Sequence, residues 1–421
     1  MRVGLLGFGT VGSSFAEVLA AGAHHEIQIM RVFNRDVQRK RQHERAKFVP
    51  ANAVWTDRVE DVLTAPDVDA VVELMGGLDP IEAWLRTALS AGKHVITANK
   101  QLIAFRGTEL LDLAAKQNVQ LMFGAAVAGG VPVIPGMVQG LSGDRIRRIS
   151  GIVNGTCNFI LSSMETGANY GEVLANAQRA GYAEADPSAD VDGLDARAKL
   201  CILARLALKA EIHPEKVPAQ TIKHVGAVDF PYAKELGCTI RQVSRAQLDG
   251  DVVRARVGPM LVPKSSPIAW SHGTQNMIVT SGEFGGDVVF SGHGAGGHPT
   301  AVAVVSDVLA VAQGSSAVRL PVHKLAVTGD VKAPHYLRLV VSDRPGIVAA
   351  IAGALAKEQI NIDSILQHRG HASDRLPFVV TTERCLRSTL DRAVVAMASM
   401  DFMLEAPLVL EILVDEDPER D

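Results

Sequence analysis

The sequence contains few cysteines and no C-x-x-C pair, which limits the kinds of site it can form. Among its 421 residues the four cysteines are Cys157, Cys201, Cys238 and Cys385, and they lie far apart. Structural zinc sites and disulfide frameworks normally need closely spaced cysteines. We therefore expect neither, and we expect a cytoplasmic protein.

An excess of positive charge is also missing. The chain has 42 Lys and Arg residues against 46 Asp and Glu, for a net charge of -4. Proteins that bind nucleic acids or anionic membranes usually carry a basic excess or a basic patch. The composition therefore indicates no nucleic-acid partner and no membrane-surface partner.

Long unbroken apolar runs are absent as well. The first residues are interrupted by glycine, unlike the continuous apolar core of a signal peptide. Residues 121–143 carry no charge, but glycines and prolines interrupt them, so a buried strand with a glycine-rich turn is expected there rather than a membrane helix. With 47% hydrophobic residues, a chain of this length should form two or three soluble domains.

The N-terminus carries a nucleotide-binding pattern. Residues 2–6 read as a buried strand, residues 7–12 read G-x-G-x-x-G, and a helical pattern follows. In this context the first glycine permits the turn, the second lets the backbone approach a pyrophosphate, and the third allows close packing of helix and strand. The alternative is a glycine-rich turn without a ligand. The predicted cofactor contacts are Gly7, Phe8, Gly9, Thr10, Val11 and Gly12.

The tip of the next strand bears on cofactor preference. A strand over residues 27–33 should end at Asn34 and Arg35, where an NAD site would usually place an acid. An arginine at this position suits the 2′-phosphate of NADP. We therefore expect NADP to be preferred over NAD, although Asp36 could turn inward and favour NAD.

Two further strands are predicted over residues 70–77 and 94–97, with a helix over residues 81–92 between them. This alternation indicates an α/β fold with a doubly wound parallel sheet. Ligands of such sheets lie at the carboxyl ends of the strands, so Thr97, Asn99 and Lys100 are candidate cofactor contacts. A lysine after a strand is otherwise most often simply solvated.

The most informative segment is residues 181–199, in which five acids precede a lysine. Asp192, Asp195 and Lys199 are spaced so that they would share one face of a helix starting near here. An ammonium group beside carboxylates can bind a zwitterionic substrate and pass it a proton. The alternative is a solvated helix start with an ordinary surface ion pair.

Residues 177–199 read A-x-x-x-G-Y-A-E-x-D-P-x-x-D-V-x-G-x-D-x-x-x-K and resemble the signature of homoserine dehydrogenases. The T-A-N-K run at 97–100, the N-G-T run at 154–156 and the G-A-G-G-x-P-T-A run at 294–301 resemble other blocks of that family. The resemblance implies reversible reduction of L-aspartate 4-semialdehyde to L-homoserine with NADPH or NADH, in threonine and methionine biosynthesis.

The resemblance also implies roles for individual residues. Lys199 would be the catalytic acid and base, and Lys100 a second cation in the same site. Asp190 and Asp195 would help to bind the amino end of the substrate. The full set of implied substrate contacts is Gly155, Thr156, Tyr182, Glu184, Asp190 and Asp195, and Gly296 would approach the cofactor.

One block departs from the family pattern. The family's E-A-x-V-x-G-G-x-P block begins here with Gly124 in place of the glutamate, which in relatives is a ligand of a structural monovalent cation. The carbonyl groups of Val127 and Gly129 could still bind a sodium ion without that carboxylate, although more weakly.

The last part of the chain predicts a βαββαβ unit, which is a ferredoxin-like arrangement. Strands are expected over residues 336–341, 361–367, 378–382 and 408–414, and helices over residues 347–358 and 388–400. The D-R-P-G turn at 343–346 and the N-I-D-S-I-L-Q run at 361–367 resemble an ACT domain. That implies an amino-acid effector, with threonine as the candidate, or a domain kept for oligomer packing.

These patterns divide the chain into three domains. We expect a dinucleotide-binding domain over residues 1–130 plus about 300–325, and an α+β catalytic and dimerisation domain over residues 131–299. An ACT domain should follow over residues 335–421, after a short polar link at 327–334. The resemblance implies a homodimer or a homotetramer.

Three alternatives remain at this point. One is another dehydrogenase of the same fold that acts on a different amino-acid aldehyde. A phosphorylating aldehyde dehydrogenase would need a nucleophilic cysteine, and Cys157 has no evident partner histidine. The third is an amino-acid sensor with a decayed active site, which only Gly124 supports.

Overall fold

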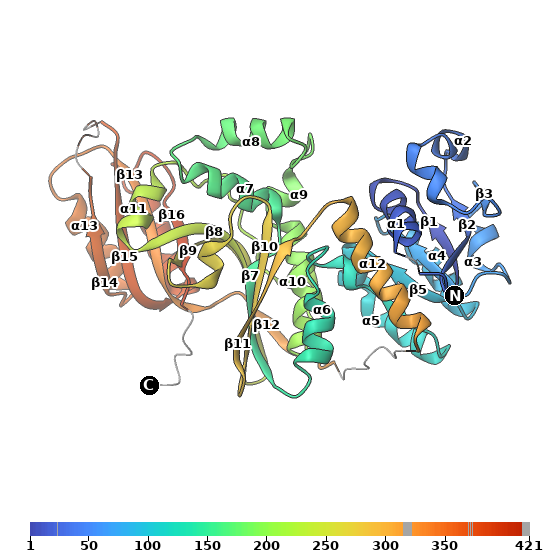
Figure 1. Cartoon of the computed structure of the whole chain (residues 1–421). Coiled ribbons are helices and arrows are strands. Elements are labelled where there is room, and N and C mark those ends of the chain that lie inside the picture. Colours follow the sequence, from blue (N-terminus) through green and yellow to red (C-terminus); the bar gives the residue numbers. More distant parts are fainter. Residues whose placement is uncertain (23, 315–321, 369, 371, 373, 415–421) are drawn as a thin grey trace.

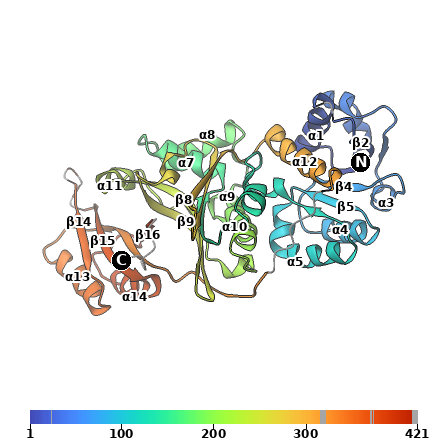
Figure 2. The same cartoon turned by 60° about the horizontal axis from the view of Figure 1, so that its bottom comes forward.

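The computed structural model describes residues 1–22, 24–314, 322–368, 370, 372 and 374–414. Three parts follow one another along the molecule, as Figures 1 and 2 show: an N-terminal parallel sheet with helices, a central antiparallel sheet, and a C-terminal α/β unit. The sheets define the places where side chains distant in sequence meet.

The N-terminal part is built on six parallel strands in the order β3-β2-β1-β4-β5-β6 within the described residues. This order reverses between β1 and β4, and ligands of such sheets bind at the carboxyl ends of the strands beside that point. The strands are β1 (Arg2–Leu6), β2 (Gln28–Phe33), β3 (Val54–Thr56), β4 (Ala70–Glu73), β5 (His94–Thr97) and β6 (Leu121–Met122). The helices are α1 (Thr10–Ala21), α2 (Val37–Arg41), α3 (Glu60–Leu63), α4 (Ile81–Ser90) and α5 (Lys100–Lys116). The predicted doubly wound sheet is confirmed.

The central part is an antiparallel sheet in the order β11-β10-β7-β8-β9. Its strands are β7 (Ile146–Ile152), β8 (Cys238–Asp249), β9 (Val252–Pro263), β10 (Gln275–Gly282) and β11 (Gly286–His293). Its helices are α6 (Val133–Pro135), α7 (Gly155–Met164), α8 (Tyr170–Arg179), α9 (Ser188–Val191), α10 (Leu194–Ala207) and α11 (Asp229–Glu235). Helix α10 is buried along most of its length because it lies between this sheet and α5.

Helix α12 (Gly297–Ala312) returns the chain to the N-terminal part. Its apolar side chains, including Ala301, Val304 and Val308, pack in one cluster with Phe15 of α1. The chain therefore crosses twice between the first two parts, and the second crossing brings the glycine-rich run at 294–297 next to the nucleotide turn.

The C-terminal part has the predicted βαββαβ order. Its elements are β13 (Lys332–Val341), α13 (Ile347–Lys357), β14 (Ile362–Leu366), β15 (Leu376–Leu386), α14 (Arg387–Ala398) and β16 (Leu408–Ile412). Strands β13 and β15 are longer than predicted because they stay paired from Lys332 opposite Leu386 to Val341 opposite Leu376. One face of this sheet packs on α13 and α14, and the other face packs on α11 of the central part.

The predicted link at 327–334 is not a free linker. Strand β12 (Ala326–Thr328) pairs in parallel with β9, and β13 begins at Lys332. Strand β16 also pairs with β9, with Glu411 opposite Met260, so the central and C-terminal sheets form one continuous sheet. Sequence patterns predict strands but not pairing between domains, which explains the difference.

Two buried ion pairs reinforce this junction. Arg256 of β9 pairs with Glu411 of β16 at 2.9 Å, and both side chains are almost fully buried. Asp229, the first residue of α11, is fully buried and pairs with Arg338 of β13. The hydroxyl of Tyr336 donates a second hydrogen bond to Asp229 at 2.7 Å.

In the part of the chain that the structure describes, no helix is both long enough and apolar enough to cross a membrane.

We predict that Arg338→Ala destabilises the protein strongly. The change would leave the Asp229 carboxylate buried without its cation, which typically costs about 3–5 kcal/mol. As a control, Arg392→Ala removes an exposed partner of Glu358, and such pairs are worth only about 0–1 kcal/mol. Urea unfolding followed by circular dichroism measures both. Equal effects of the two variants would contradict the prediction.

Candidate active site

A cavity of about 380 Å³ lies at the carboxyl ends of β1, β4 and β5, where the N-terminal and central parts meet. Residues from six separate stretches of the sequence line it. Those that the sequence had singled out are Thr10, Val11, Asn99, Lys100, Gly129, Lys199 and Gly296. The fold thus assembles one site from the nucleotide turn, the T-A-N-K run, the acid-rich segment and the second glycine-rich run.

The glycine turn has the geometry that a dinucleotide needs. Gly7 has φ +97°, and a Cβ atom at Gly12 would lie 2.1 Å from the carbonyl oxygen of Gly7. A Cβ atom at Gly9 would meet nothing within 4 Å, so the backbone there is open on the ligand side. Helix α1 begins directly afterwards, and no side chain caps its first amide groups. Free amide groups at a helix start suit a pyrophosphate.

Just after the end of β2, the carboxylate of Asp36 already interacts with Arg39. Its carboxylate caps α2 by accepting a hydrogen bond from the amide of Arg39 and also pairs with the Arg39 side chain at 3.2 Å. Asn34 accepts a hydrogen bond from the Asp36 amide. Arg35 forms no ion pair with any acid in the described residues. These residues lie outside the 380 Å³ cavity.

Thr97 and Asn99 shape the loop that carries Lys100. Thr97 is buried behind the cavity, where its hydroxyl donates to Glu73 at 2.6 Å and accepts from the Asn99 amide at 2.9 Å. Asn99 caps α5 by accepting from the Leu102 amide. Lys100 is therefore the first residue of α5, and its place is fixed by two residues before it.

Two lysines share one carboxylate at the bottom of the site. Asp195 Oδ1 lies 3.0 Å from Lys100 Nζ, and Asp195 Oδ2 lies 2.8 Å from Lys199 Nζ. Lys199 also donates to the carbonyl of Val153 at 2.8 Å. The side chains of Asp195 and Lys199 are about nine-tenths buried, whereas that of Lys100 is 39% exposed. Lys199 is thus held rigidly, and Lys100 has more freedom.

The charges stabilise one another. Burial would raise the pKa of Asp195, but the ammonium groups of Lys199 and Lys100 bring it well below its usual range. Burial would lower the pKa of Lys100, but Asp195 beside it raises that pKa above its ordinary value. Asp195 is therefore an anion and Lys100 a cation at neutral pH.

Asn154 joins this cluster, although the sequence had not marked it as a site residue. Its amide group donates to Asp190 at 2.6 Å and to Asp195 at 2.9 Å, while its oxygen accepts from the amide of Cys157. The position of Asn154 directly before a helix, where asparagine is a favoured cap, is the signal that could have found it. Burial raises the pKa of Asp190 above its ordinary value.

None of the predicted substrate contacts is among the residues that line the 380 Å³ cavity. A Cβ atom at Gly155 would lie 2.8 Å from the carbonyl oxygen of Thr274, so the glycine is needed for packing. Thr156 donates to the carbonyl of Tyr182 at 2.6 Å. The ring of Tyr182 is about half exposed, and Glu184 is exposed but close enough to raise the pKa of Lys100.

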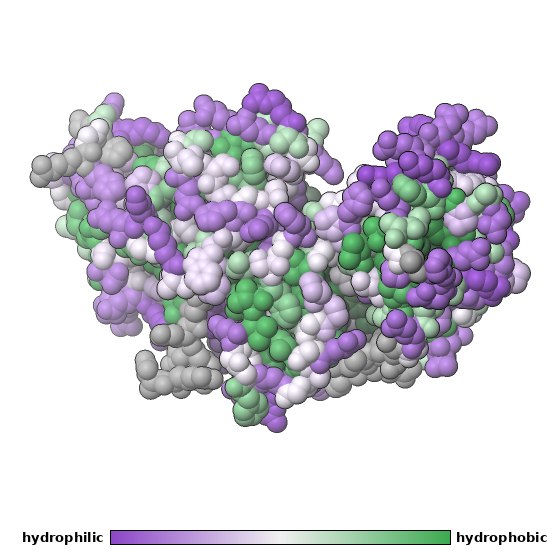
Figure 3. Space-filling model, viewed as in Figure 1, coloured by the Kyte–Doolittle hydropathy of each residue, from purple (hydrophilic) through white to green (hydrophobic). Residues whose placement is uncertain are grey.

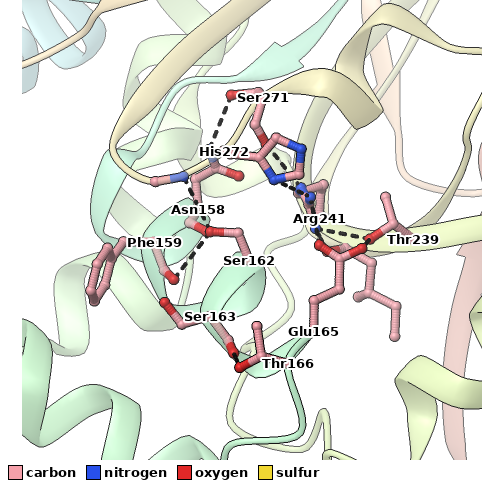
Figure 4. A network of polar contacts seen from close by, with 12 residues as sticks. Asn158, Phe159, Ser162, Ser163, Glu165, Thr166, Thr239, Arg241, Ser271 and His272 are labelled. Atoms are coloured by element: carbon pink, nitrogen blue, oxygen red, sulfur yellow. Dashed lines mark hydrogen bonds and ion pairs between the residues drawn. The ribbon is translucent and has the colours of Figure 1, made fainter.

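A buried polar network holds helix α7, whose first turn carries Gly155 and Thr156. Figure 4 shows the fully buried Arg241 of β8 at its centre, donating to Glu165 at the end of α7 at 2.9 Å and to the carbonyl of Ser271 at 3.2 Å. Asn158 of α7 donates to the Ser271 hydroxyl at 3.0 Å. The loop that contains Ser271 also contains Thr274, whose carbonyl lies against Gly155. The network therefore fixes both α7 and the loop that packs against its first turn.

Asp192 does not share a helix face with Asp195 and Lys199, so that part of the prediction is wrong. Gly193 adopts φ +78° and ends α9, and α10 starts only at Leu194. Asp192 therefore turns away and pairs with Lys223 on the surface at 3.0 Å. The i,i+4 pair of Asp195 and Lys199 survives because both residues lie within α10.

A carboxylate from another element stands beside Gly124. Asp307 of α12 accepts a hydrogen bond from the Gly124 amide at 2.7 Å, and a Cβ atom at Gly124 would lie only 2.7 Å from its Oδ1. Burial raises the pKa of Asp307 to about 7. A side chain at 124 would displace the Asp307 carboxylate from this position. Within the described ranges, no group of three or more His, Cys, Asp or Glu side chains could hold a metal ion.

Comparisons with known proteins agree with this geometry. Residues 7–124 match the family model described as homoserine dehydrogenase, NAD binding domain, residues 132–309 match that of homoserine dehydrogenase, and residues 335–390 match that of the ACT domain. The chain is 38% identical to the homoserine dehydrogenase of Bacillus subtilis over 396 residues, covering 90% of each chain. It is also 38% identical to that of Mycobacterium tuberculosis H37Rv over 437 aligned positions, covering 97% of each.

The chain belongs to the homoserine dehydrogenase family. Its structure resembles the homoserine dehydrogenase of Thiobacillus denitrificans with a TM-score of 0.91 and 33% identity over 98% of both chains. The Staphylococcus aureus enzyme gives a TM-score of 0.78 at 30% identity, again over 98% of both. The fold, the ACT domain and the NAD(P)-dependent reduction of aspartate semialdehyde to homoserine, expected from the sequence, are thereby confirmed.

The alternatives are correspondingly disfavoured. Cys157 is fully buried and burial raises its thiol pKa well above the ordinary value, so it is not a reactive nucleophile of a phosphorylating enzyme. The sensor hypothesis rested on Gly124 alone, whereas the chain belongs to an enzyme family and Asp195 pairs with both Lys100 and Lys199.

Asp307→Asn should flatten the pH dependence of stability. The pKa of Asp307 is about 7 in the folded protein and 3.8 ordinarily, so the folded protein holds this proton more tightly. The group therefore contributes its full stability below pH 3.8, and this contribution is lost as the pH rises through about 7. The native protein should therefore lose more stability than Asp307→Asn between roughly pH 5 and pH 8.

Thermal unfolding at a series of pH values tests this. Asp401→Asn, a change to an exposed acid, serves as the control and should leave the native profile unchanged in this range. Parallel pH profiles for the native protein and Asp307→Asn would refute the raised pKa.

Proposed function

We propose that Lys199 is the proton donor and acceptor of the homoserine dehydrogenase reaction and that Lys100 stabilises the developing charge on the substrate oxygen. The proposal rests on one observation: Asp195 forms an ion pair with each of the two lysines, beside the nucleotide turn. The nicotinamide supplies or accepts the hydride when the cofactor is bound.

The chemistry requires cations at this place. Hydride addition to the aldehyde carbon leaves negative charge on oxygen, which a preorganised ammonium group stabilises. Lys199 can then give that oxygen a proton, and in the reverse direction take it back. Asp195 keeps both ammonium groups oriented, and Asn154 fixes Asp195 in turn.

We propose that the amino end of the substrate lies toward Asp190 and Glu184, which supply negative charge at the rim. Gly155, Thr156 and Tyr182 would complete the pocket at the first turn of α7. Support comes from the hydrogen bond between Asn154 and Asp190, which joins this rim to Asp195.

Lys199→Ala should lower kcat by about a hundredfold or more, which is the usual contribution of general acid–base catalysis. Lys199→Arg should be similarly slow, because arginine keeps the charge but does not release a proton near neutral pH. Homoserine-dependent reduction of the nicotinamide at alkaline pH measures both variants, with Lys116→Ala as a surface control. A Lys199→Arg variant that keeps most of the native kcat would show that only the charge matters.

For the cofactor, we propose that NADP is preferred over NAD. Arg35 carries no acidic partner among the described residues, while Asp36 is engaged by Arg39 and is not free to bind a ribose hydroxyl. A hyperthermophilic archaeal homoserine dehydrogenase with 25% identity and a TM-score of 0.66 has been solved in complex with NADPH.

Arg35→Ala should raise KM for NADPH by roughly tenfold, the value of one charge-assisted contact, and leave KM for NADH nearly unchanged. Arg41→Ala, on the same short helix region, is the matched control. Equal changes for both cofactors would mean that Arg35 does not contact a 2′-phosphate.

We further propose that the enzyme acts in the cytoplasm and is regulated by threonine at its ACT domain. The functional division would be residues 1–130 with about 300–325 for the cofactor, 131–299 for catalysis and 335–421 for regulation. Of these, residues 23, 315–321, 369, 371, 373 and 415–421 lie outside the described residues.

For a sodium ion, we propose only the carbonyls of Val127 and Gly129 as ligands, because the Asp307 carboxylate is engaged by the Gly124 amide.

We propose that the chain forms at least a dimer through its central sheet. Figure 3 shows apolar side chains gathered over the region of β7, β10 and β11. Val289 of the edge strand β11 and Phe284 at the adjoining turn are exposed.

A further inference from the structure

A buried side-chain amide without a hydrogen-bond partner lies behind the wall of the active-site cavity. It belongs to Asn276, near the start of β10, which is only 1% exposed. Among the described residues, neither the nitrogen nor the oxygen of this side chain has a partner. An amide left unpaired in a protein interior costs free energy, because water pairs with both of its ends in the unfolded chain. None of the roles proposed for the lysines and acids of the site uses this amide.

Asn276 rests against the glycine-rich run at 294–297. A Cβ atom at Gly294 would lie 2.1 Å from Cγ of Asn276, 2.2 Å from its nitrogen and 2.4 Å from its oxygen. Because these distances are nearly equal, the flat face of the amide lies on Gly294 and its polar edges point sideways. Gly294 lines the active-site cavity and Asn276 does not. The backbone of the run therefore separates the amide from the cavity.

Asn276 also lies next to the residue that holds Lys199. Met277 pairs with Ile152 of β7, so the next register position places Asn276 beside Val153. The carbonyl of Val153 accepts a hydrogen bond from Lys199 at 2.8 Å. The unpaired amide is thus adjacent both to the support of Lys199 and to a wall of the cavity.

The other end of the glycine-rich run reaches the nucleotide turn. A Cβ atom at Gly297 would lie 2.7 Å from Ser14 Oγ and 3.2 Å from the carbonyl oxygen of Thr10, so this end packs on α1. Gly296 has φ +116°, a conformation that residues with a side chain rarely adopt. Thr10, Gly296 and Gly297 all line the cavity. A cofactor bound at the nucleotide turn would therefore contact the run, whose glycine backbone can adjust to it.

We propose that Asn276 is a positioning residue for the cofactor. When NAD(P) binds in the cavity, the glycine-rich run adjusts, and the Asn276 amide exchanges hydrogen bonds with one of the peptide groups of the run. The two groups match, because each carries a donor and an acceptor. These bonds form only in the cofactor-bound enzyme, so they favour that state over the free enzyme. A ligand shifts a conformational equilibrium only through such a difference between the two states.

A purely structural role of Asn276 predicts a different behaviour. Leucine branches at Cγ as asparagine does, so it can fill the same space without polar atoms. Replacing an unpaired polar group by an apolar group of similar shape is neutral or stabilising. If the amide serves only for packing, Asn276→Leu should leave cofactor binding unchanged. If it pairs with the run in the bound enzyme, the same change should weaken binding while the free enzyme stays as stable.

The test uses the full-length enzyme and compares Asn276→Leu with the native chain. Thermal unfolding without ligand measures the free enzyme, calorimetry measures the affinity for NADP and for NAD, and steady-state kinetics give kcat and KM. Ser281→Ala is the matched control, because it removes another buried hydroxyl without a partner in the described residues, at the opposite end of β10. Asn276→Ala is a second variant that lacks the amide and introduces no larger side chain.

We expect Asn276→Leu to unfold at the native temperature or above it and to bind the cofactor roughly tenfold more weakly, as the loss of two hydrogen bonds predicts. Asn276→Ala should show the same loss of affinity, and Ser281→Ala should bind the cofactor like the native enzyme. The kcat of Asn276→Leu at saturating cofactor should stay near the native value, which separates this effect from a failure of the proposed acid–base role of Lys199.

Two results would overturn the proposal. Native cofactor affinity in Asn276→Leu and Asn276→Ala would show that the amide makes no bond in the bound enzyme. A large loss of stability in Asn276→Leu without cofactor, or its failure to fold, together with native affinity in Asn276→Ala, would show that the side chain serves only the packing of β10.

Discussion

The structure of the site depends on one buried carboxylate, that of Asp195, which two lysines share. An isolated buried charge is costly, and so are two ammonium groups close together. The carboxylate between them removes both costs and allows two cations to stand beside the nucleotide turn. Each partner comes from a different place: Lys100 starts α5 of the N-terminal part, whereas Asp195 and Lys199 belong to α10 of the central part. The cluster therefore forms only when the two parts meet correctly, which ties the geometry of the reaction to the packing between domains.

Contacts elsewhere in the protein fix the elements that carry this cluster. The Arg241 network fixes α7 and the loop around Thr274, and Asn154 at the start of α7 orients both Asp190 and Asp195. On the far side, pairing of β16 with β9 makes the C-terminal sheet an extension of the central one. A C-terminal domain joined in this way cannot swing on a flexible tether. A ligand bound to it would act on the rest of the enzyme through small shifts of packed elements, because protein interiors are close-packed.

Local patterns in the sequence predicted what local structure determines. The glycine turn after a buried strand, the T-A-N-K run at a strand end and the βαββαβ order were all expected and are confirmed. The sequence did not predict features that depend on contacts between distant segments, such as Asp307 beside Gly124 or the pairing of β16 with β9. Asp192 was placed wrongly because one left-handed glycine, Gly193, separates two short helices, and periodicity alone does not detect such a break. Asn154 needed the rule for helix caps rather than the rule for charged clusters.

The absence of a side chain at 124 has a consequence for how α12 is held. Because no Cβ atom fills the space, the Asp307 carboxylate of α12 reaches the Gly124 amide, which lies 183 residues earlier in the chain. A larger residue at 124 would push this carboxylate aside and weaken a contact that joins α12 to the nucleotide-binding part.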